Sequence, residues 1–198
     1  FTCTVSTPIT VPQLTPRAAS VAAGARSTCV LTTETGVKCW GLNFEGSLGR
    51  GDSSIYSTAN PADVVGMTSG VASLTAGYNH YCARTSGGAV KCWGRGYHGL
   101  LGNGGSSNGL IPVDVIGLSS GVKSVDAGDF HACAITAVNE LKCWGENDYG
   151  QLGNGLSGQG VYSDTPITVS GLSPGVIAVS AGRYHTCAIV VGGGVKCW

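Results

Sequence analysis

The sequence predicts an all-β protein in which a unit of about 50 residues is repeated four times. Each unit has an Ala-Gly dipeptide, a cysteine, and then a Lys-Cys-Trp triplet, and the second cysteines (Cys39, Cys92, Cys143, Cys197) are 53, 51 and 54 residues apart. A fixed period of this size is typical of propellers, solenoids or arrays. No window has helical spacing of apolar residues, and Gly, Ser, Asn and Asp turns separate short apolar runs. Four strands per unit favour a β-propeller-type array of four four-stranded blades.

The units divide the chain into segments whose first strands we expect to begin at proline. The segments are an N-terminal extension, residues 1–6, and repeats at 7–40, 41–93, 94–144 and 145–198. Proline is tolerated at a strand start or a sheet edge. The predicted first strands are residues 7–11, 61–65, 112–116 and 165–169.

The second strand of each unit is predicted from a small, apolar run that suits a crowded inner position. These runs are residues 20–23, 71–76, 122–127 and 176–181. The glycine that follows allows close approach of two backbones. The third and fourth strands form a hairpin that carries the cysteines, and polar loops follow at 50–60, 103–111 and 154–164.

Pairing the two cysteines of a unit across its hairpin fixes the register. With Cys82 opposite Cys92, Tyr81 faces Trp93 and Ala83 faces Lys91, so the cysteines share one face and the tryptophan lies on the other. Opposed residues in an antiparallel pair lie ~4.5–5.5 Å apart at Cα, within disulfide range. We expect the disulfides Cys29–Cys39, Cys82–Cys92, Cys133–Cys143 and Cys187–Cys197. Each stabilises the fold by ~2–3 kcal/mol on the chain-entropy model.

Zinc and free buried thiols are the competing interpretations of these cysteines. His80, His131 and His185 lie two residues before a cysteine, which gives three candidate ligands per unit. Tetrahedral zinc needs a fourth ligand or a water, and the first unit has Ser27 in place of histidine. We therefore expect no metal, and histidines that are hydrogen-bonded core residues linking one blade to the next.

One tryptophan recurs in each unit. The four are Trp40, Trp93, Trp144 and Trp198. Because a buried aromatic contributes a large apolar area, we expect a packing ladder between blades. A series of rings that stacks on carbohydrate or another ligand is the alternative.

Composition limits the compartment and the partners. Nine cysteines, eight in regular pairs, predict an oxidising location: extracellular, at the cell surface, or in the periplasm. Zero net charge argues against nucleic acid, and no apolar run approaches the ~18 residues of a membrane span. The start at Phe1 suggests a processed or truncated product, and the pattern suggests continuation beyond Trp198. Residues 114–164 carry a net charge of −5, either a solvated acidic face or a contact for a basic neighbour.

No motif predicts catalysis or a cofactor. Residues 150–155 are glycine-rich but lack the lysine and the strand–helix context of a phosphate loop. Asn147 and Asp148 supply two oxygen side chains, fewer than calcium requires. We expect a non-enzymatic protein without cofactor, for which a small-molecule ligand is improbable.

The chain resembles the regulator of chromosome condensation (RCC) repeat family. The shared pattern is an Ala-Gly-x-x-His turn, Ala-Ile-Thr, Lys-Cys-Trp-Gly and Gly-Gln-Leu-Gly-Asn-Gly; it is clearest over 121–155 and covers about 190 of the 198 residues. The resemblance implies a propeller. Eukaryotic members are nucleotide exchange factors that bind chromatin; bacterial relatives are often secreted, and one inhibits β-lactamases by protein contact. This chain lacks a basic tail and a long insertion, so the resemblance does not imply exchange activity.

The two ends of the repeat array are complementary. If each blade takes its outer strand from the next unit, the last blade, residues 176–198, lacks one, and residues 7–11 have no blade to join. The chain is then part of a larger propeller, a small closed ring, or a unit that donates residues 7–11 to another copy. Cys3 lies near that joint and is a candidate for an intermolecular bridge. We expect a structural, protein-binding repeat protein that assembles with copies of itself; the alternative is an inhibitor or recognition module that binds a protein through its loops.

Overall fold

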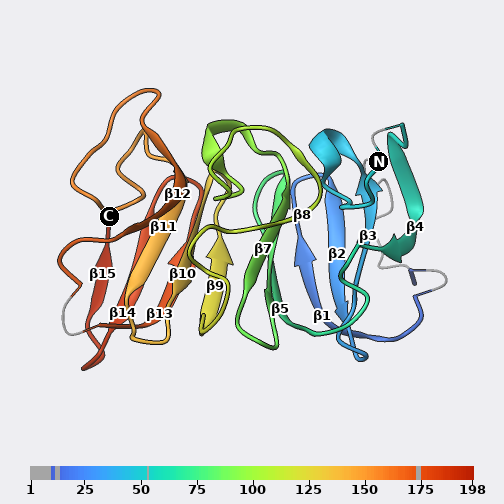
Figure 1. Cartoon of the computed structure of the whole chain (residues 1–198), viewed down its shortest axis with the longest axis horizontal. Helices are drawn as coiled ribbons and strands as arrows, with labels where there is room; N and C mark the ends of the chain where they lie inside the picture. Colours follow the sequence, from blue (N-terminus) through green and yellow to red (C-terminus); the bar gives the residue numbers. More distant parts are fainter. Residues whose placement is uncertain (1–9, 12–13, 53, 173–174) are drawn as a thin grey trace.

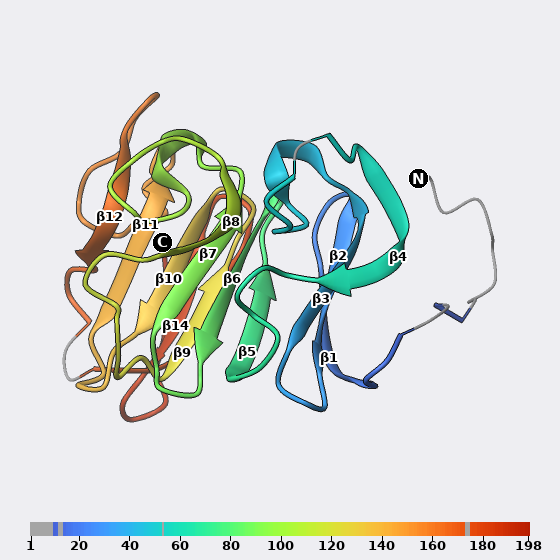
Figure 2. The ribbon, with the colours of Figure 1, turned by 45° about the vertical axis from the view of Figure 1, so that its right-hand side comes forward.

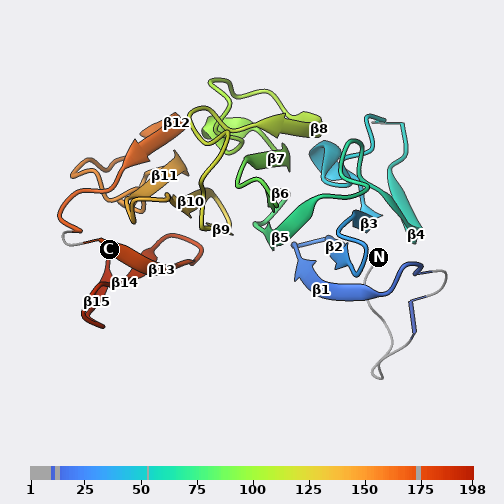
Figure 3. The ribbon, with the colours of Figure 1, turned by 60° about the horizontal axis from the view of Figure 1, so that its bottom comes forward.

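The protein is an arc of four antiparallel β-sheets in a computed structural model that describes residues 10–11, 14–52, 54–172 and 175–198 (Figure 1). The strands are β1 (Ala18–Ala23), β2 (Ser27–Thr32), β3 (Val37–Leu42), β4 (Ser57–Asp63), β5 (Val71–Ala76), β6 (His80–Thr85), β7 (Val90–Gly94), β8 (Gly109–Asp114), β9 (Ser124–Ala127), β10 (His131–Ile135), β11 (Leu141–Glu146), β12 (Tyr162–Thr168), β13 (Val176–Ala181), β14 (Thr186–Val190) and β15 (Val195–Cys197). The sheets do not close into a ring, and β1, β5, β9 and β13 line the inside of the arc (Figure 3). The all-β, propeller-type prediction is confirmed.

Each sheet takes its outer strand from the sequence unit that follows. The orders are β1-β2-β3-β4, β5-β6-β7-β8 and β9-β10-β11-β12, whereas the last sheet is β13-β14-β15. The last sheet thus lacks an outer strand within the described residues, as predicted from the complementary ends of the repeat array, and the arc is open rather than a small closed ring.

The outer strands begin before the prolines that we expected to open them. Pro61, Pro112 and Pro166 lie inside β4, β8 and β12. In the first sheet the register moves from Cys39↔Ala62 to Gly41↔Thr58, so three residues of β4 bulge opposite Trp40. Proline is tolerated in such a bulge because the ladder there needs no amide donor.

The inner strands are less crowded than their small residues suggest. Val21 of β1 is 68% exposed and lies opposite Val30, on the face of the first sheet that carries Trp40. Ile177 of β13 is 58% exposed and lies at an irregularity in the pairing with β14. β9 begins at Ser124 rather than at residue 122, whereas β1 begins two residues earlier than expected, at Ala18.

The hydrophobic core is divided among the three interfaces between neighbouring sheets. At each one, the cysteine face of one sheet packs on the tryptophan face of the next, together with the residues that follow the outer strand. The first interface holds Cys29, Cys39, Val64, Met67, Tyr81 and Trp93; the second Cys82, Cys92, Val115, Leu118, Ala132 and Trp144; the third Cys133, Cys143, Val169, Leu172, Ala188 and Trp198.

Glycine is required where the sheets approach most closely. A Cβ at Gly128 would lie 2.0 Å from the carbonyl oxygen of Gly182 in the next sheet and 2.8 Å from the His131 ring. The Ala-Gly dipeptide of each repeat therefore allows both the backbone contact between sheets and the inward histidine.

The loops after the third strands gather at one end of the sheets (Figure 2). Two of them contain short 3-10 helices, η1 (Phe44–Gly46) and η2 (Tyr97–Gly99), which the sequence analysis did not expect. Among the described residues, none of the helices has the length and apolar character of a membrane span.

Candidate protein-interaction surfaces

The eight paired cysteines form four disulfides within hairpins. The bonds are Cys29–Cys39, Cys82–Cys92, Cys133–Cys143 and Cys187–Cys197, each with Cα atoms 4.1 Å apart. The register places Tyr81 opposite Trp93 and Ala83 opposite Lys91. Since both sulfurs of each pair are used, no thiolate remains there for zinc. Cys3 lies outside the described residues.

Three tryptophans anchor one sheet to the previous one. The indole N–H of Trp93 donates to the carbonyl of Ser47 at 3.1 Å, that of Trp144 to Leu100 at 3.1 Å, and that of Trp198 to Gln151 at 3.0 Å. These acceptors belong to the glycine-rich turns after the third strands. Trp40 lies on the outer face of the first sheet, half-buried, and has no such acceptor within the described part of the chain.

The inward histidines do not share one environment. His131 Nε2 lies 2.8 Å from the hydroxyl of Thr186, which in turn donates to the Gln151 carbonyl at 2.8 Å. In the equivalent position of the first interface, Ser27 and Tyr81 hydroxyls lie 2.9 Å apart. The second interface has Ala132 at this position, so neither ring nitrogen of the buried His80 has a hydrogen-bond partner among the described residues.

The expected histidine links are thus formed by His131 but not by His80, and His185 lies exposed on the last sheet. Burial, followed by electrostatic repulsion from the nearby His131 and Arg95 when His80 is protonated, lowers the pKa of His80 to about 3. Burial, with the nearby His185, lowers the pKa of His131 to about 4. Both rings are therefore neutral at pH 7.

No strand of the described residues pairs with the outer edge of the last sheet. In the first three sheets, the lysine of the Lys-Cys-Trp triplet reaches the outer strand: Lys38 Nζ contacts Asp63 Oδ1 at 2.7 Å, and Lys142 Nζ contacts Thr168 Oγ1 at 2.9 Å. In the last sheet, Lys196 Nζ donates to the Gly171 carbonyl instead, at 2.8 Å. An open pocket of about 520 Å³ lies beside this edge, lined in part by Val169, Lys196 and Trp198.

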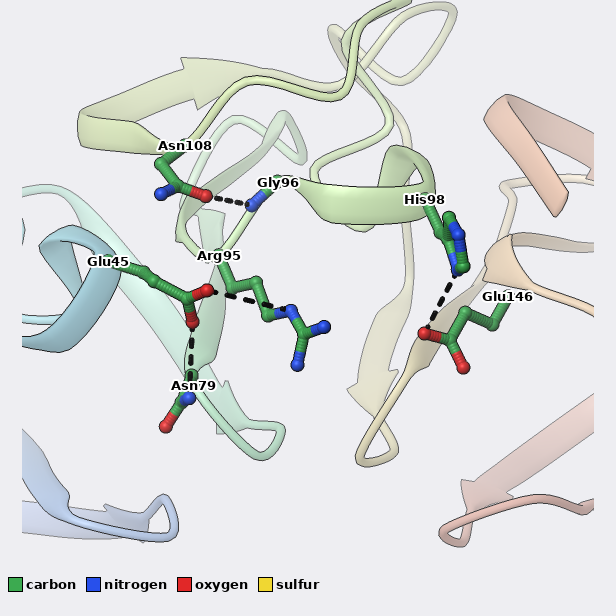
Figure 4. A network of polar contacts seen from close by, with 7 residues as sticks. All are labelled: Glu45, Asn79, Arg95, Gly96, His98, Asn108 and Glu146. Carbon is green, nitrogen blue, oxygen red and sulfur yellow. Dashed lines mark hydrogen bonds and ion pairs between the residues drawn. The ribbon is translucent and has the colours of Figure 1, made fainter. Parts of the chain in front are cut away.

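A second surface is named the loop face. It is formed by the turns after the first strands (24–26, 77–79, 128–130, 182–184) and the loops after the third strands (43–52, 54–56, 95–108, 147–161). A polar network links neighbouring sheets there (Figure 4). Asn79 Nδ2 donates to Glu45 Oε2 at 3.2 Å, and Arg95 Nε lies 3.8 Å from Glu45 Oε1. His98 Nδ1 lies 3.2 Å from Glu146 Oε1.

The loop face also carries a row of neighbouring aromatic rings across three sheets. Tyr78 and Phe130 have ring centres 5.9 Å apart, Phe130 and Tyr184 5.5 Å, and Tyr149 and Tyr184 4.8 Å. Arg95 and Arg183 both approach the Phe130 ring, each with its guanidinium carbon 5.8 Å from the ring centre. The sequence analysis missed this row; its signal is the aromatic residue at a variable position of the Ala-Gly-x-x-His turn in three of four units.

The described residues offer no metal centre. Nowhere in that part of the chain do three His, Cys, Asp or Glu side chains converge as metal ligands would. What the surfaces supply is an exposed strand edge and an aromatic, charged face, which are the elements of contacts with polypeptides.

Comparisons with known proteins agree with the repeat architecture. Two models of the regulator of chromosome condensation (RCC1) repeat match the chain, one at residues 18–47, 71–100 and 122–151 and the other at 88–135 and 141–189. The ultraviolet-B receptor UVR8 of Arabidopsis thaliana is 31% identical over 181 residues, which cover 90% of this chain and 40% of UVR8.

Solved structures give the same result. Human WBSCR16 superposes with a TM-score of 0.80 at 24% identity, over 92% of this chain and 47% of WBSCR16. The ectodomain of the Physcomitrella patens receptor kinase CR4 superposes with a TM-score of 0.57 at 26% identity, over 91% of this chain and 40% of the ectodomain chain. This chain thus spans less than half the length of these relatives. With the repeat frame, the sheet arc and these matches in agreement, the chain belongs to the RCC1 repeat family.

Proposed function

We propose that this chain is a non-enzymatic, protein-binding repeat module that works in an oxidising extracellular compartment and assembles head to tail with copies of itself. The observation that carries the proposal is the unpaired outer edge of β15 beside the pocket around Trp198. Exposed strand edges accept a further strand through main-chain hydrogen bonds.

The edge has a predictable occupant. The outer strands and the residue that follows them read Pro-Ala-Asp-Val, Pro-Val-Asp-Val and Pro-Ile-Thr-Val, and the final valines Val64, Val115 and Val169 are buried beside the next tryptophan. Residues 8–11 read Pro-Ile-Thr-Val. Donated to β15 of another copy, this segment would bring Val11 to the half-buried Trp40 of its own first sheet.

The proposed compartment is supported by four disulfides, which persist under oxidising conditions. The similarity to a receptor ectodomain points the same way. Cys3 lies close in sequence to the donated segment, so an intermolecular bridge through it would lock the joint.

The test uses the direction of the backbone amides of β15. Thr186 and Trp198 exchange both backbone hydrogen bonds, at 2.9 Å each. Hydrogen-bonded and non-hydrogen-bonded pairs alternate along an antiparallel ladder. The N–H groups of Val195 and Cys197 therefore point away from β14, toward the open edge. Val195→Pro removes an outward N–H without removing a bond to β14, and Val195→Thr is the matched control that keeps it.

Light scattering coupled to size-exclusion chromatography measures the molar mass in solution. We expect a mass above that of one chain for the wild type and Val195→Thr, and 19.9 kDa for Val195→Pro. Unchanged thermal melting of Val195→Pro would show that the hairpin is intact. Equal masses for the two variants would contradict the proposal.

A second candidate function, recognition of a partner protein through the loops, is favoured by the composition of the loop face. The sequence has seven Tyr and three Phe, of which Phe1 lies outside the described residues. All the others except Tyr81 and Tyr162 lie on the loop face. Four of six arginines lie there, Arg26, Arg50, Arg95 and Arg183, and none of the five lysines. Enrichment in aromatic residues and arginine with depletion of lysine distinguishes protein-binding surfaces from other surfaces.

A further inference from the structure

We propose that the Arg–aromatic row of the loop face, defined as Tyr78, Arg95, Phe130, Arg183 and Tyr184, binds an acidic, extended segment of a partner protein. This inference deepens the second candidate function and rests on it. The two arginines supply carboxylate-binding forks, and the rings supply the platform that holds the forks in place.

The two guanidinium groups are only partly used inside the chain. Arg95 Nε lies 3.8 Å from Glu45 Oε1, and Arg183 Nε lies 3.7 Å from Asp129 Oδ2, beyond hydrogen-bonding distance in both cases. Arg95 Nε is buried without a hydrogen-bond partner among the described residues. In Figure 4 the far end of the Arg95 guanidinium points away from Glu45. The terminal N–H groups of Arg95 therefore remain available for a bidentate contact, and Arg183, which also bonds the Tyr184 side chain, keeps further N–H groups for a carboxylate.

The rings hold these arginines in position. Both guanidinium groups lie near the Phe130 ring, and Arg183 also lies over Tyr184, 5.0 Å from the ring centre. Arg95 also lies over Tyr97, at 5.4 Å. Stacking on an aromatic face restrains the planar guanidinium group. The arginine side chain therefore loses less conformational entropy when it binds a carboxylate.

The geometry favours a polypeptide over a carbohydrate. A sugar stacks on a free ring face, but the faces in this row lie against one another or against guanidinium groups, with interplanar angles of 29° and 16° for Tyr78–Phe130 and Phe130–Tyr184. Ring edges, hydroxyls and forks remain for the ligand. Two forks that flank a single ring favour a segment with two carboxylates on one face, as alternate residues of an extended chain provide.

The probe is a fluorescein-labelled peptide containing Glu-Leu-Glu-Leu-Glu, with a Lys-Leu-Lys-Leu-Lys peptide as the charge control, titrated with Val195→Pro protein and followed by anisotropy. Using that variant separates this test from strand assembly, which the variant is designed to block. The acidic peptide should bind and the basic one should not. Arg95→Lys/Arg183→Lys keeps both charges but removes the forks, and should weaken binding by about tenfold or more.

Arg50→Lys is the matched control, because Arg50 lies on the loop face outside the row, and it should bind as its parent does. Equal binding by the double variant and its parent, equal binding of both peptides, or binding of cellohexaose in place of the acidic peptide would overturn the inference. Any of these three results would leave the proposal of head-to-tail assembly untouched, because assembly is tested by the measured mass.

Discussion

The buried His80 ring identifies a position where one added hydroxyl should stabilise the protein. A neutral imidazole carries one N–H, and at His80 this donor is buried without a partner among the described residues. At the third interface the equivalent His131 is paired with Thr186 at 2.8 Å. Ala132 occupies the place of Thr186 at the second interface, so Ala132→Ser brings a hydroxyl to His80.

The expected gain follows from the net value of a hydrogen bond. An intramolecular hydrogen bond contributes about 1 kcal/mol, and an unsatisfied buried polar group costs about 1–3 kcal/mol. We therefore expect Ala132→Ser to raise the free energy of unfolding by about 1 kcal/mol at pH 7. Urea unfolding followed by tryptophan fluorescence measures this change directly.

The control is Ala134→Ser on the same strand and face. Ala134 is also fully buried in the second interface, but no unpaired histidine nitrogen faces it. Burying a hydroxyl without a partner should lower stability by about 1–3 kcal/mol. If Ala132→Ser and Ala134→Ser were destabilising to the same extent, the assignment of His80 as an unpaired donor would be refuted.

Three further predictions concern the sheet interfaces. The pKa values of His80 and His131 are depressed in the fold, to about 3 and about 4, so the unfolded chain binds protons more readily than the folded chain. The free energy of unfolding should be constant above about pH 6.5 and fall toward pH 4, by up to about 1.4 kcal/mol per histidine per pH unit. Equal urea midpoints at pH 7 and pH 5 would contradict this. Trp144→Phe leaves a buried carbonyl without its 3.1 Å indole donor and should cost about 2–3 kcal/mol in thermal unfolding, whereas a loss below about 0.5 kcal/mol would exclude an anchoring role. Gly128→Ala places a Cβ 2.0 Å from a backbone oxygen and should cost about 3 kcal/mol or more, while Gly87→Ala, with no atom nearer than 3.9 Å, should be neutral; similar losses would show that the close approach is unimportant.

Local spacing was sufficient to predict the hairpins. With the two cysteines ten positions apart and directly opposed, one antiparallel register follows, and this register places Tyr81 opposite Trp93. The small, apolar runs of residues 71–76 and 176–181 likewise predicted β5 and β13 with their observed bounds. These features depend on neighbours along the chain, which a single sequence shows.

The bounds of the outer strands could not be predicted in the same way. Pro61 suggested a strand start, but the bulge opposite Trp40 admits proline inside β4, and the polar residues before it pair with β3. The pairing of those residues depends on the register of a strand about 20 residues away, which propensity does not report.

The histidine environments and the loop face depend on which residues of different repeats meet. His80 and His131 occupy the same position in the repeat, but the next sheet places Ala132 at the His80 ring and Thr186 at the His131 ring. Phe130 and Arg95 are 35 positions apart and belong to different sheets, so their contact could not be predicted without knowing how neighbouring sheets are placed. The repeat pattern therefore predicted the sheets, whereas the composition of the loop face depends on the residues that vary from one repeat to the next.

Whether the ends of the arc mate with other copies is tested most directly by hydrogen exchange at β15. The account predicts that the outward amides of Val195 and Cys197 are protected at high protein concentration and exchange rapidly after dilution, while the amide of Trp198, bonded to Thr186, stays protected at both. Rapid exchange of Val195 and Cys197 at every concentration, or protection that does not change on dilution, would contradict donation of a strand from another molecule.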